Sequence, residues 1–389
     1  MKHSLALLLV CAVQSGAAET PQALPAKLQS FFTPPAEFAG QLGSYASPLK
    51  FYDGRPVASP AEWPARRAEI LRYWHDQMGP WPELLARPKL ELSERQVREG
   101  VTQHRVSIEV APGVMQNGFL LVPPGPAPRP AVLVPFYVPE VSVAYDGPRP
   151  LEGQAKKMMT EGSRGKDRDF ALQLARRGFV TLAIGSPGGD AYQPGRTRCQ
   201  RLSYAAYVAA NCHTALAQRP EVDPARIGVM GHSYGGKWAM FASCLHEKFA
   251  TGVWSDGGIV FDESRGNVNY WEPWYLGFDP KTERKRGLVK PDNPRTGAYK
   301  AIFESGHDLH ELHALMAPRP FLVSGGAEDF PARWVALNHA VAVNDFLGHK
   351  NRVAMTNRRE HSPNPESNEQ AFAFLEFVLG PVTPPPAPR

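Results

Sequence analysis

The chain has 389 residues, enough to bury a large hydrophobic core in one or two domains. Hydrophobic residues make up 43% and charged residues 21% of the sequence, proportions typical of a globular protein and not of a disordered one. The formal net charge of +5 is small for this length, and no Lys/Arg run with interleaved aromatic residues occurs. We therefore expect no nucleic-acid partner.

The first 18 residues have the features of a secretory signal peptide. Lys2 and His3 give a short polar start, residues 5–13 are apolar, and Ser15–Ala18 offers small residues for cleavage. The apolar stretch is too short to cross a bilayer, and no other stretch is long enough. We therefore expect a secreted or periplasmic protein that has no membrane contact after cleavage.

The next part of the chain predicts an arm followed by the start of one large domain. Residues 19–60 are rich in Pro, Ala and Gly and predict an extended N-terminal arm before a domain over 61–380. Apolar spacing predicts a helix over 61–78, and alternation predicts strands within 89–110 and 117–123. Residues 381–389 predict a disordered Pro-rich tail. The three cysteines beyond the leader are expected to be buried free thiols; they are Cys199, Cys212 and Cys244.

From residue 131 onward, short apolar runs alternate with helical patterns. Strands are predicted at 131–135, 179–184, 227–230, 250–254, 320–324 and 351–357, and helices at 169–177, 203–218, 334–346 and 369–379. This alternation predicts an α/β fold with a mostly parallel twisted sheet, covered by helices on both faces and preceded by antiparallel strands. Residues 138–168 and 256–318 are long and irregular, and we expect them to form a partial cap.

The run Gly231-His232-Ser233-Tyr234-Gly235 matches the nucleophile-elbow pattern G-x-S-x-G. An apolar strand precedes it and a helical pattern follows, which is the context that the motif requires. In such an elbow the serine lies on a strained turn that directs its hydroxyl out of the sheet. Glycines flank it because a Cβ there would collide with its neighbours. We therefore predict that Ser233 is a nucleophile in an α/β-hydrolase fold.

A serine hydroxyl needs a base, and the base needs a carboxylate to orient it. His361 is the best-placed base, since it follows the last strand and precedes the closing helix. Two acids compete, namely Asp329 after the 320–324 strand and Asp256 after the 250–254 strand. Strand order alone favours Asp329, and Glu328 beside it could also serve.

From about Trp63 to Leu379 the chain resembles the glucuronoyl esterases, a carbohydrate esterase family of α/β-hydrolases. Their elbow has the pattern G-C-S-R-x-G-K and their acid follows in E-S-G-x-G-G; here residues 231–237 are G-H-S-Y-G-G-K and 255–258 are S-D-G-G. Residues 307–320 resemble the family's H-x-L-x-A-L-x-A-P-R-P stretch. The resemblance implies Ser233 as nucleophile, Asp256 as acid and His361 as base, with Lys237 contacting a sugar.

Three departures from the family pattern concern the substrate. Tyr234 replaces the arginine that helps hold the oxyanion, Asp256 replaces a glutamate, and Glu311 stands where the family has a substrate-facing tryptophan. A looser likeness extends to dienelactone-hydrolase and acetylxylan-esterase types. The fold expectation is unaffected, but the ester is left open between a glucuronate ester and a small acyl ester.

Several further residues have both a binding and a structural interpretation. Lys237 could donate to sugar hydroxyls or be a solvated surface lysine, and Trp271 and Trp274 could stack on sugars or pack a loop. Arg319 is expected to be structural rather than a carboxylate clamp. The histidines at 307, 310 and 313 could share one helix face, but family precedent favours packing, so no metal is expected.

Together these residues predict a secreted serine carboxylic-ester hydrolase that needs no cofactor and acts on a carbohydrate ester or another small ester. The oxyanion would accept hydrogen bonds from the Tyr234 N–H and from an N–H near Phe136 or Tyr137. A deacetylase or dienelactone-type esterase, an exopeptidase-like hydrolase and a catalytically inactive binding protein are the alternatives.

Overall fold

A computed structural model of the protein describes residues 23–160, 167–187 and 199–380. The predicted signal peptide at 1–18 and the predicted tail at 381–389 lie outside the described residues. Within the described part of the chain, no helix is both long and apolar enough to cross a membrane.

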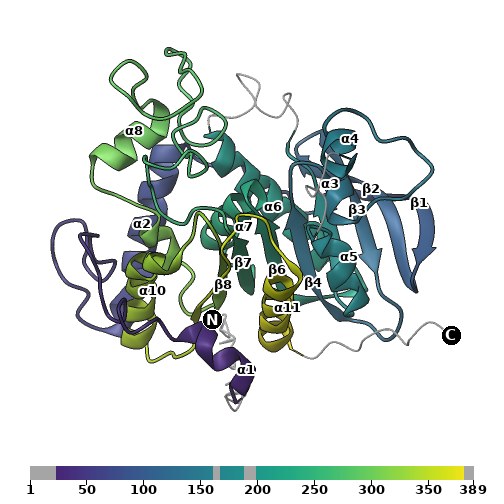
Figure 1. Ribbon diagram of the computed structural model, residues 1–389, viewed down its shortest axis with the longest axis horizontal. Helices are drawn as coiled ribbons and strands as arrows, with labels where there is room; N and C mark the ends of the chain where they lie inside the picture. Colours follow the sequence, from purple (N-terminus) through teal and green to yellow (C-terminus); the bar gives the residue numbers. More distant parts are fainter. Residues whose placement is uncertain (1–22, 161–166, 188–198, 381–389) are drawn as a thin grey trace, which may run out of the picture.

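A twisted sheet forms the centre of the molecule (Figure 1). Its strands among the described residues are β1 Leu90–Arg98, β2 Val101–Ala111, β3 Val114–Val122, β4 Arg129–Pro135, β5 Val180–Ile184, β6 Val222–His232, β7 Thr251–Ser255, β8 Phe321–Gly325 and β9 Val353–Asn357. They are ordered β1-β2-β3-β5-β4-β6-β7-β8-β9. The first three strands pair antiparallel with one another and β3 pairs antiparallel with β5, whereas all pairs from β5 to β9 are parallel. This confirms the predicted parallel sheet with an antiparallel start.

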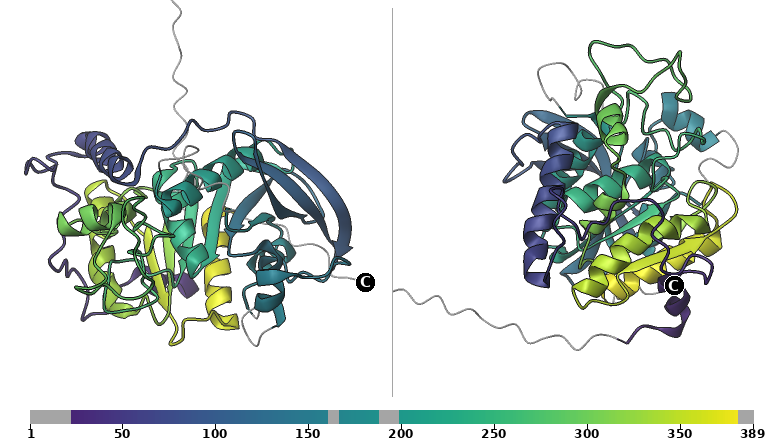
Figure 2. Two further views of the ribbon diagram at one scale, coloured as in Figure 1. Left: turned by 90° about the horizontal axis from the view of Figure 1, so that it is seen from above. Right: turned by 90° about the vertical axis from the view of Figure 1, so that its left-hand side faces the viewer.

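Helices cover both faces of the sheet and divide the core into two hydrophobic clusters. The longer helices are α2 Trp63–Met78, α6 Arg201–Ala217, α7 Tyr234–Leu245, α10 Trp334–Phe346 and α11 Pro365–Leu379, with the shorter α5 Phe170–Arg176. One cluster contains residues of α2, α6, α7 and α10, and the other contains residues of α5 and α11. Figure 2 shows the two further views of this layered arrangement, with the antiparallel strands curling away at one end. The two-sided cover explains why the buried parts of the central strands, such as residues 227–230 of β6, are apolar.

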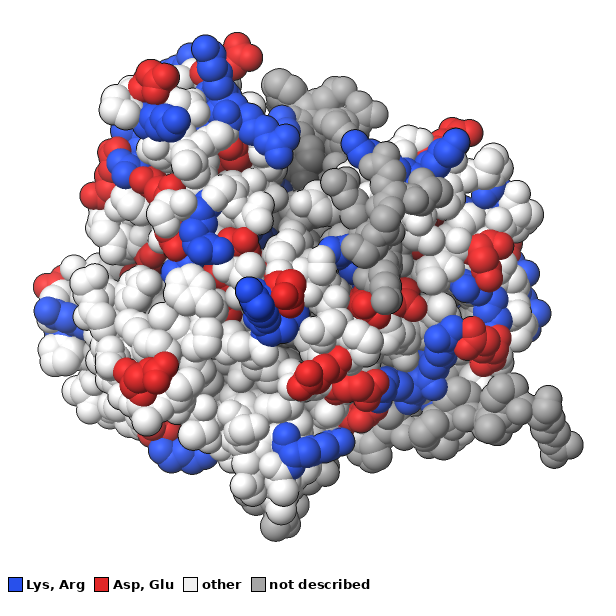
Figure 3. All heavy atoms as spheres, in the orientation of Figure 1, with Lys and Arg blue, Asp and Glu red and all other residues white. Residues whose placement is uncertain are grey.

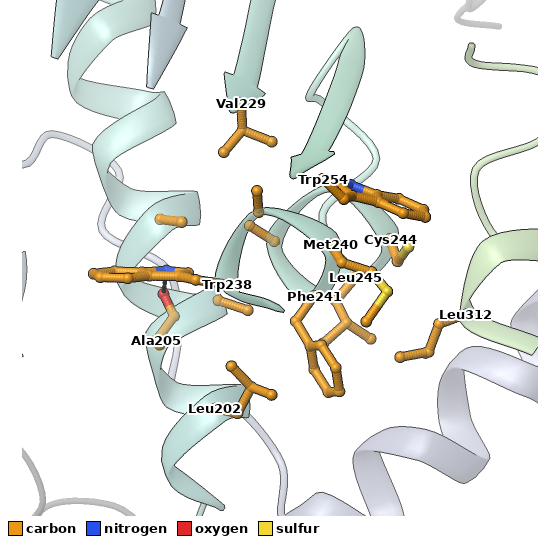
Figure 4. Packing of buried hydrophobic residues seen from close by; sticks show 14 of the residues in the cluster. Leu202, Ala205, Val229, Trp238, Met240, Phe241, Cys244, Leu245, Trp254 and Leu312 are labelled. Atoms are coloured by element: carbon orange, nitrogen blue, oxygen red, sulfur yellow. Dashed lines mark hydrogen bonds between the residues drawn. The ribbon is translucent and has the colours of Figure 1, made fainter. Parts of the chain in front are cut away.

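The elbow helix α7 is fixed by large buried side chains (Figure 4). Trp238 is fully buried and its indole N–H donates a hydrogen bond to the Ala205 carbonyl oxygen of α6. Trp254 of β7 is also fully buried and its indole N–H donates to Ser243 Oγ of α7, at 3.1 Å. Side chains that lock α7 against both its neighbouring helix and the sheet also fix the serine that precedes it.

Residues 23–60, which lie in the stretch predicted as an N-terminal arm, contain the short helix α1 Ala26–Gln29 and are hydrogen-bonded to the body. Side chains of the body donate to carbonyl oxygens of the arm: His310 Nε2 to Ala46 at 2.7 Å, and Asn338 Nδ2 to Phe38 at 2.7 Å. Hydrogen bonds to backbone carbonyls hold the arm without requiring any regular structure within it.

Two insertions gather at the top of the molecule in Figure 1. The first, between β4 and β5, carries α3 Pro139–Ser142 and α4 Gly153–Thr160; the second, between β7 and β8, carries α8 Gly297–Glu304 and α9 His310–Ala314. They correspond to the two stretches that the sequence predicts as a partial cap. Cys199, Cys212 and Cys244 are buried and free.

Candidate active site

Ser233 lies on a sharp turn between β6, which ends at His232, and α7, which begins at Tyr234. Its backbone has φ +56° and ψ −116°, a conformation that is strained for any residue with a side chain. The flanking glycines are required by space. A Cβ on Gly235 would lie 2.2 Å from the Pro135 carbonyl oxygen, and a Cβ on Gly231 would lie 2.2 Å from the Gly235 carbonyl oxygen. The predicted strand–turn–helix elbow is therefore present.

A hydrogen-bonded relay connects three side chains from distant parts of the sequence. Ser233 Oγ lies 3.0 Å from His361 Nε2, and His361 Nδ1 lies 2.6 Å from Asp256 Oδ2. Because the Asp256 carboxylate only accepts, Nδ1 donates to it, which leaves Nε2 with a lone pair directed at the serine hydroxyl. The arrangement can remove a proton from Ser233 as that oxygen becomes a nucleophile.

The second candidate acid, Asp329, does not bond His361 but supports the loop that carries Asp256. Its carboxylate accepts hydrogen bonds from the N–H groups of Gly258 at 2.9 Å and Ile259 at 2.7 Å. Asp256 in turn accepts from the N–H of Asp329 at 2.9 Å and of Glu328 at 3.1 Å. Burial, with the charge of Asp256 as the next cause, raises the pKa of Asp329 to about 6. The order of strands thus gives the wrong partner for the imidazole.

Glu328, the third possible acid, is committed elsewhere. It is buried, and its carboxylate pairs with Arg265 at 3.0 Å and accepts from the Asn267 amide at 3.0 Å. Both partners belong to the loop after β7. Glu328 therefore helps to attach this loop to the end of β8.

Arg358, which sequence reasoning missed, holds the loop of the histidine. Its guanidinium donates to the carbonyl oxygens of His361 at 2.7 Å, Ser362 at 2.8 Å and Ser324 at 2.8 Å. It also donates to Gly325 O at 3.1 Å. The planar group thus connects the His361 loop with the end of β8. A sequence signal existed, since an arginine lies three residues before the histidine, but its acceptors are carbonyl oxygens that carry no sequence pattern.

The predicted oxyanion donors are only partly compatible with the structure. Tyr234 is the first residue of α7, where N–H groups have no acceptor within the helix. The Phe136 N–H instead donates to the Ile184 carbonyl oxygen of β5 at 3.0 Å. The prediction of Phe136 as an oxyanion donor was therefore wrong, because this N–H is already used in backbone pairing. The Tyr137 N–H, the alternative named from the sequence, has no acceptor among the described residues. This leaves Tyr234 and Tyr137 as the candidate pair.

The three predicted sugar-binding residues do not line the cavity at Ser233. Lys237 is 3% exposed, and its ammonium donates to the carbonyl oxygens of Gly257 and Asn267, so it is neither a sugar ligand nor a solvated lysine. Burial lowers its pKa to about 8. Trp271 is buried and its indole N–H donates a hydrogen bond to the Gly287 carbonyl oxygen, whereas Trp274 is half-buried. All three fix the loop after β7, because it is large enough to need a core of its own.

The histidines of α9, and His307 just before it, contact other side chains of the fold. His307 Nδ1 lies 3.0 Å from Glu311, and His313 is buried with its ring centroid 5.4 Å from that of Trp254. Among the described residues, no group of three or more His, Cys, Asp or Glu is arranged to hold a metal ion. Arg319 donates to the Ser243 and Phe249 carbonyl oxygens, as expected of a structural arginine.

A cavity of about 550 Å³ opens at the relay, within the size range of small-molecule sites. The described residues that line it are Phe136, Tyr137, Gln154, Lys157, Met158, Arg168, His232, Ser233, Arg286 and His361. His232 is buried, its ring centroid lies 4.8 Å from that of His361, and its Nδ1 donates to the Ser255 carbonyl oxygen at 3.1 Å. Burial holds the pKa of His232 well below its usual range, so this neighbour of His361 is neutral.

Comparison with known proteins agrees with this fold. A glucuronoyl esterase from Solibacter usitatus matches with a TM-score of 0.68 at 20% identity, over 87% of this chain and 99% of that chain. A promiscuous CE15 esterase from a marine bacterial metagenome matches with a TM-score of 0.65 at 18% identity, over 86% and 97%. The chain has the α/β-hydrolase fold.

Two further matches have different activities in their names, so the fold alone does not identify the reaction. The model of the prolyl oligopeptidase family matches residues 168–303. A candidate acetyl xylan esterase from Bacteroides fragilis NCTC 9343 matches with a TM-score of 0.53 at 16% identity, over 80% of this chain and 79% of that chain. No curated protein matches. At these identities the likeness establishes the fold, and function has to be argued from the site.

On this fold the three relay residues follow one another along the chain in the order Ser233, Asp256, His361. Nucleophile, acid and base follow in the same order in other proteins of this fold. Each lies just beyond the carboxyl end of a parallel strand, after β6, β7 and β9 respectively. That edge is where open α/β sheets bind their ligands.

Proposed function

We propose that the protein is a serine carboxylic-ester hydrolase that acts on a carbohydrate ester, with an ester of a glucuronic acid residue as the preferred substrate. The observation that carries the proposal is the relay with Ser233–His361 at 3.0 Å and His361–Asp256 at 2.6 Å. The likeness to solved glucuronoyl esterases over nearly their whole length supports the carbohydrate class.

The reaction follows the acyl-transfer scheme. His361 Nε2 takes the Ser233 proton while Ser233 Oγ attacks the ester carbonyl carbon, and the oxyanion accepts from the Tyr234 and Tyr137 N–H groups. The imidazolium, stabilised by Asp256, returns the proton to the departing alcohol oxygen as the C–O bond breaks. A water molecule then loses a proton to His361 and attacks the acyl-enzyme; the imidazolium returns that proton to Ser233 Oγ as the acyl C–O bond breaks, which releases the acid.

The proposal predicts hydrolysis of benzyl glucuronate that depends on Ser233. Ser233→Ala should lower kcat by at least about 10⁴-fold, because it removes the hydroxyl that lies 3.0 Å from His361 Nε2. Turnover is measured by release of benzyl alcohol, and a fluorophosphonate should label the parent protein but not the variant.

Three other outcomes have distinct meanings. Turnover of p-nitrophenyl acetate without turnover of benzyl glucuronate would favour a deacetylase or dienelactone-type enzyme. Cleavage of aminoacyl p-nitroanilides alone would point to peptidase chemistry, in line with the family model over residues 168–303. Absence of both turnover and labelling would indicate a binding protein and contradict the proposal.

We further propose that residues 1–18 direct export and are removed. The apolar stretch and the small residues at 15–18 support this. N-terminal sequencing of protein from the periplasm or medium should begin at Ala18 or Glu19. A mature protein that still begins at Met1 would contradict it.

A further inference from the structure

The cavity at Ser233 is cationic. Lys157, Arg168 and Arg286 line it together with the nucleophile, and no Asp or Glu is among the described residues that do so. The acid of the relay does not change this, because Asp256 is 1% exposed and its carboxylate is occupied by His361 and two N–H groups. Among the described lining residues, a ligand in the cavity therefore meets three cationic side chains and no carboxylate.

The three cations reach the cavity from separate segments. Lys157 lies on α4, Arg168 lies just before α5, and Arg286 belongs to the long insertion after β7. Figure 3 shows Lys and Arg side chains on both upper lobes of the molecule, over the α8 region and over the α3–α4 region. Convergence from three segments is not the pattern of a single solvated charged helix face.

The positive charges of Arg286 and Arg168 also act on Tyr137, which lines the cavity together with the nucleophile. Burial raises the pKa of the Tyr137 hydroxyl, hydrogen bonds with Tyr275 and Ser233 act against that rise, and the positive charges of Arg286 and Arg168 do so to a smaller extent. Tyr137 lines the cavity, and its ring centroid lies 4.9 Å from that of Tyr234, the residue after the nucleophile. The field of the arginines is thus present at the place where the ester must bind.

Two of the three cations are also available to a ligand. Arg286 and Lys157 are exposed, and neither has an ion-pair partner among the residues that the structure describes. The guanidinium of Arg286 lies 5.8 Å from the ring centroid of Trp274, which limits where it can go. Arg168 donates to Ser362 Oγ at 2.9 Å, so it is held at the loop of His361.

We propose that the ester substrate carries, besides the neutral scissile ester at Ser233, an anionic group that binds between Arg286 and Lys157. This group is a carboxylate or a sulfate. This inference rests on the proposed esterase function and specifies its substrate as an ester within an acidic glycan. The carboxyl group of a glucuronate is neutral once it is esterified. The negative charge must therefore come from another substituent or from another residue of the glycan. Clefts lined by one sign of charge favour ligands of opposite charge in both encounter and binding.

The test compares three methyl esters of one uronate disaccharide. The second residue bears a free carboxylate, the corresponding carboxamide, or a sulfate ester. We expect kcat/KM to be about tenfold higher for both anionic esters than for the carboxamide, and the advantage to shrink as salt is raised from 20 to about 500 mM. The ratio between carboxylate and sulfate distinguishes the two sources of charge.

Variants then assign the effect to the cavity. Arg286→Gln and Lys157→Gln should each lower the anionic preference by about threefold, and the double variant should bring it close to one. Lys281→Gln is the matched control, because Lys281 is an exposed cation of the same insertion that does not line the cavity, and it should leave the preference unchanged. Arg168 is left intact because it contacts the histidine loop.

Equal rates for the three esters, or equal losses of the anionic preference in Arg286→Gln, Lys157→Gln and the control Lys281→Gln, would overturn the inference while leaving the esterase proposal in place. Failure of every ester to react would instead remove the proposed function on which it rests.

Discussion

Asp256 and Asp329 follow neighbouring parallel strands, and each carboxylate accepts hydrogen bonds from backbone N–H groups of the other's loop. Asp256 alone reaches the imidazole, partly because its backbone has φ +47°, an uncommon conformation for a residue with a side chain. Such a twist is invisible in the sequence. Composition and strand order place a carboxylate at both loops and cannot say which of them turns toward His361.

Amide substitutions should separate the two aspartates. Asp256→Asn should lower kcat about 10³- to 10⁴-fold, because the amide no longer stabilises the imidazolium and favours the wrong tautomer. Asp329→Asn keeps an oxygen that can accept from Gly258 or Ile259, so kcat should fall by less than about tenfold. Steady-state kinetics on the same ester, with thermal unfolding as a check on folding, would decide. Comparable losses in the two variants would contradict the assignment of a single acid.

At the scale of elements, the strand–turn–helix of the elbow was predictable because its requirements are local. Gly231 and Gly235 relieve clashes with the backbone within and beside the turn, and they leave a clear sequence signal. The positions of Lys237 and Trp271 were not predictable, because their burial depends on the fold of an insertion that has little regular structure. A lysine on an elbow helix has the same local pattern whether it faces sugar or carbonyl oxygens.

Arg358 connects the His361 loop to the end of β8, and its loss should affect the reaction more than the binding of substrate. Arg358→Met should lower kcat by about 10- to 100-fold with little change in KM, since misplacement of the base by about 1 Å is enough for such a loss. Arg358→Lys should recover only part of it, because a lysine cannot reproduce the planar fork. Arg359→Met, at the exposed neighbour, is the control. An effect on KM alone would contradict the positioning role.

At the scale of the whole molecule, buried titratable groups make stability depend on pH. Burial lowers the pKa of eight described histidines. Among the five with the largest shifts, the pKa is about 4 for His213 and His310, about 3 for His246, and well below the usual range for His232 and His313. They stay neutral in the native state, while the unfolded chain takes up their protons below about pH 6.5. Burial raises the pKa of Asp308 to about 7 and of Asp329 to about 6, which acts in the opposite direction.

Because the histidines outnumber the two aspartates, the free energy of unfolding should fall as the pH falls from about 6.5 to 4. We expect a loss of at least about 1.4 kcal/mol between pH 7 and pH 5, the equivalent of one proton over one pH unit. Urea unfolding at both values measures it. His246→Phe removes one of these groups and should make the dependence shallower. Equal or greater stability at pH 5 would contradict this balance.

The layered architecture was the most predictable property of the molecule, because strands buried on both faces are apolar throughout and alternate with helices. Periodicity therefore predicted which segments form strands and helices, and that the sheet begins with antiparallel strands. It did not predict the cationic lining, because Lys157, Arg168 and Arg286 are separated along the sequence and no motif links them. Only folding of the two insertions brings them to one cavity.

The relay residues are fastened to strand ends, whereas Lys157 and Arg286 come from insertions that lie between strands. Bond breaking and ligand selection consequently belong to separate parts of the polypeptide. Relatives could exchange one insertion for another, and so bind a different substrate, without changing the strand ends that carry the relay residues. The same separation makes these two segments natural cassettes for retargeting the enzyme by loop grafting.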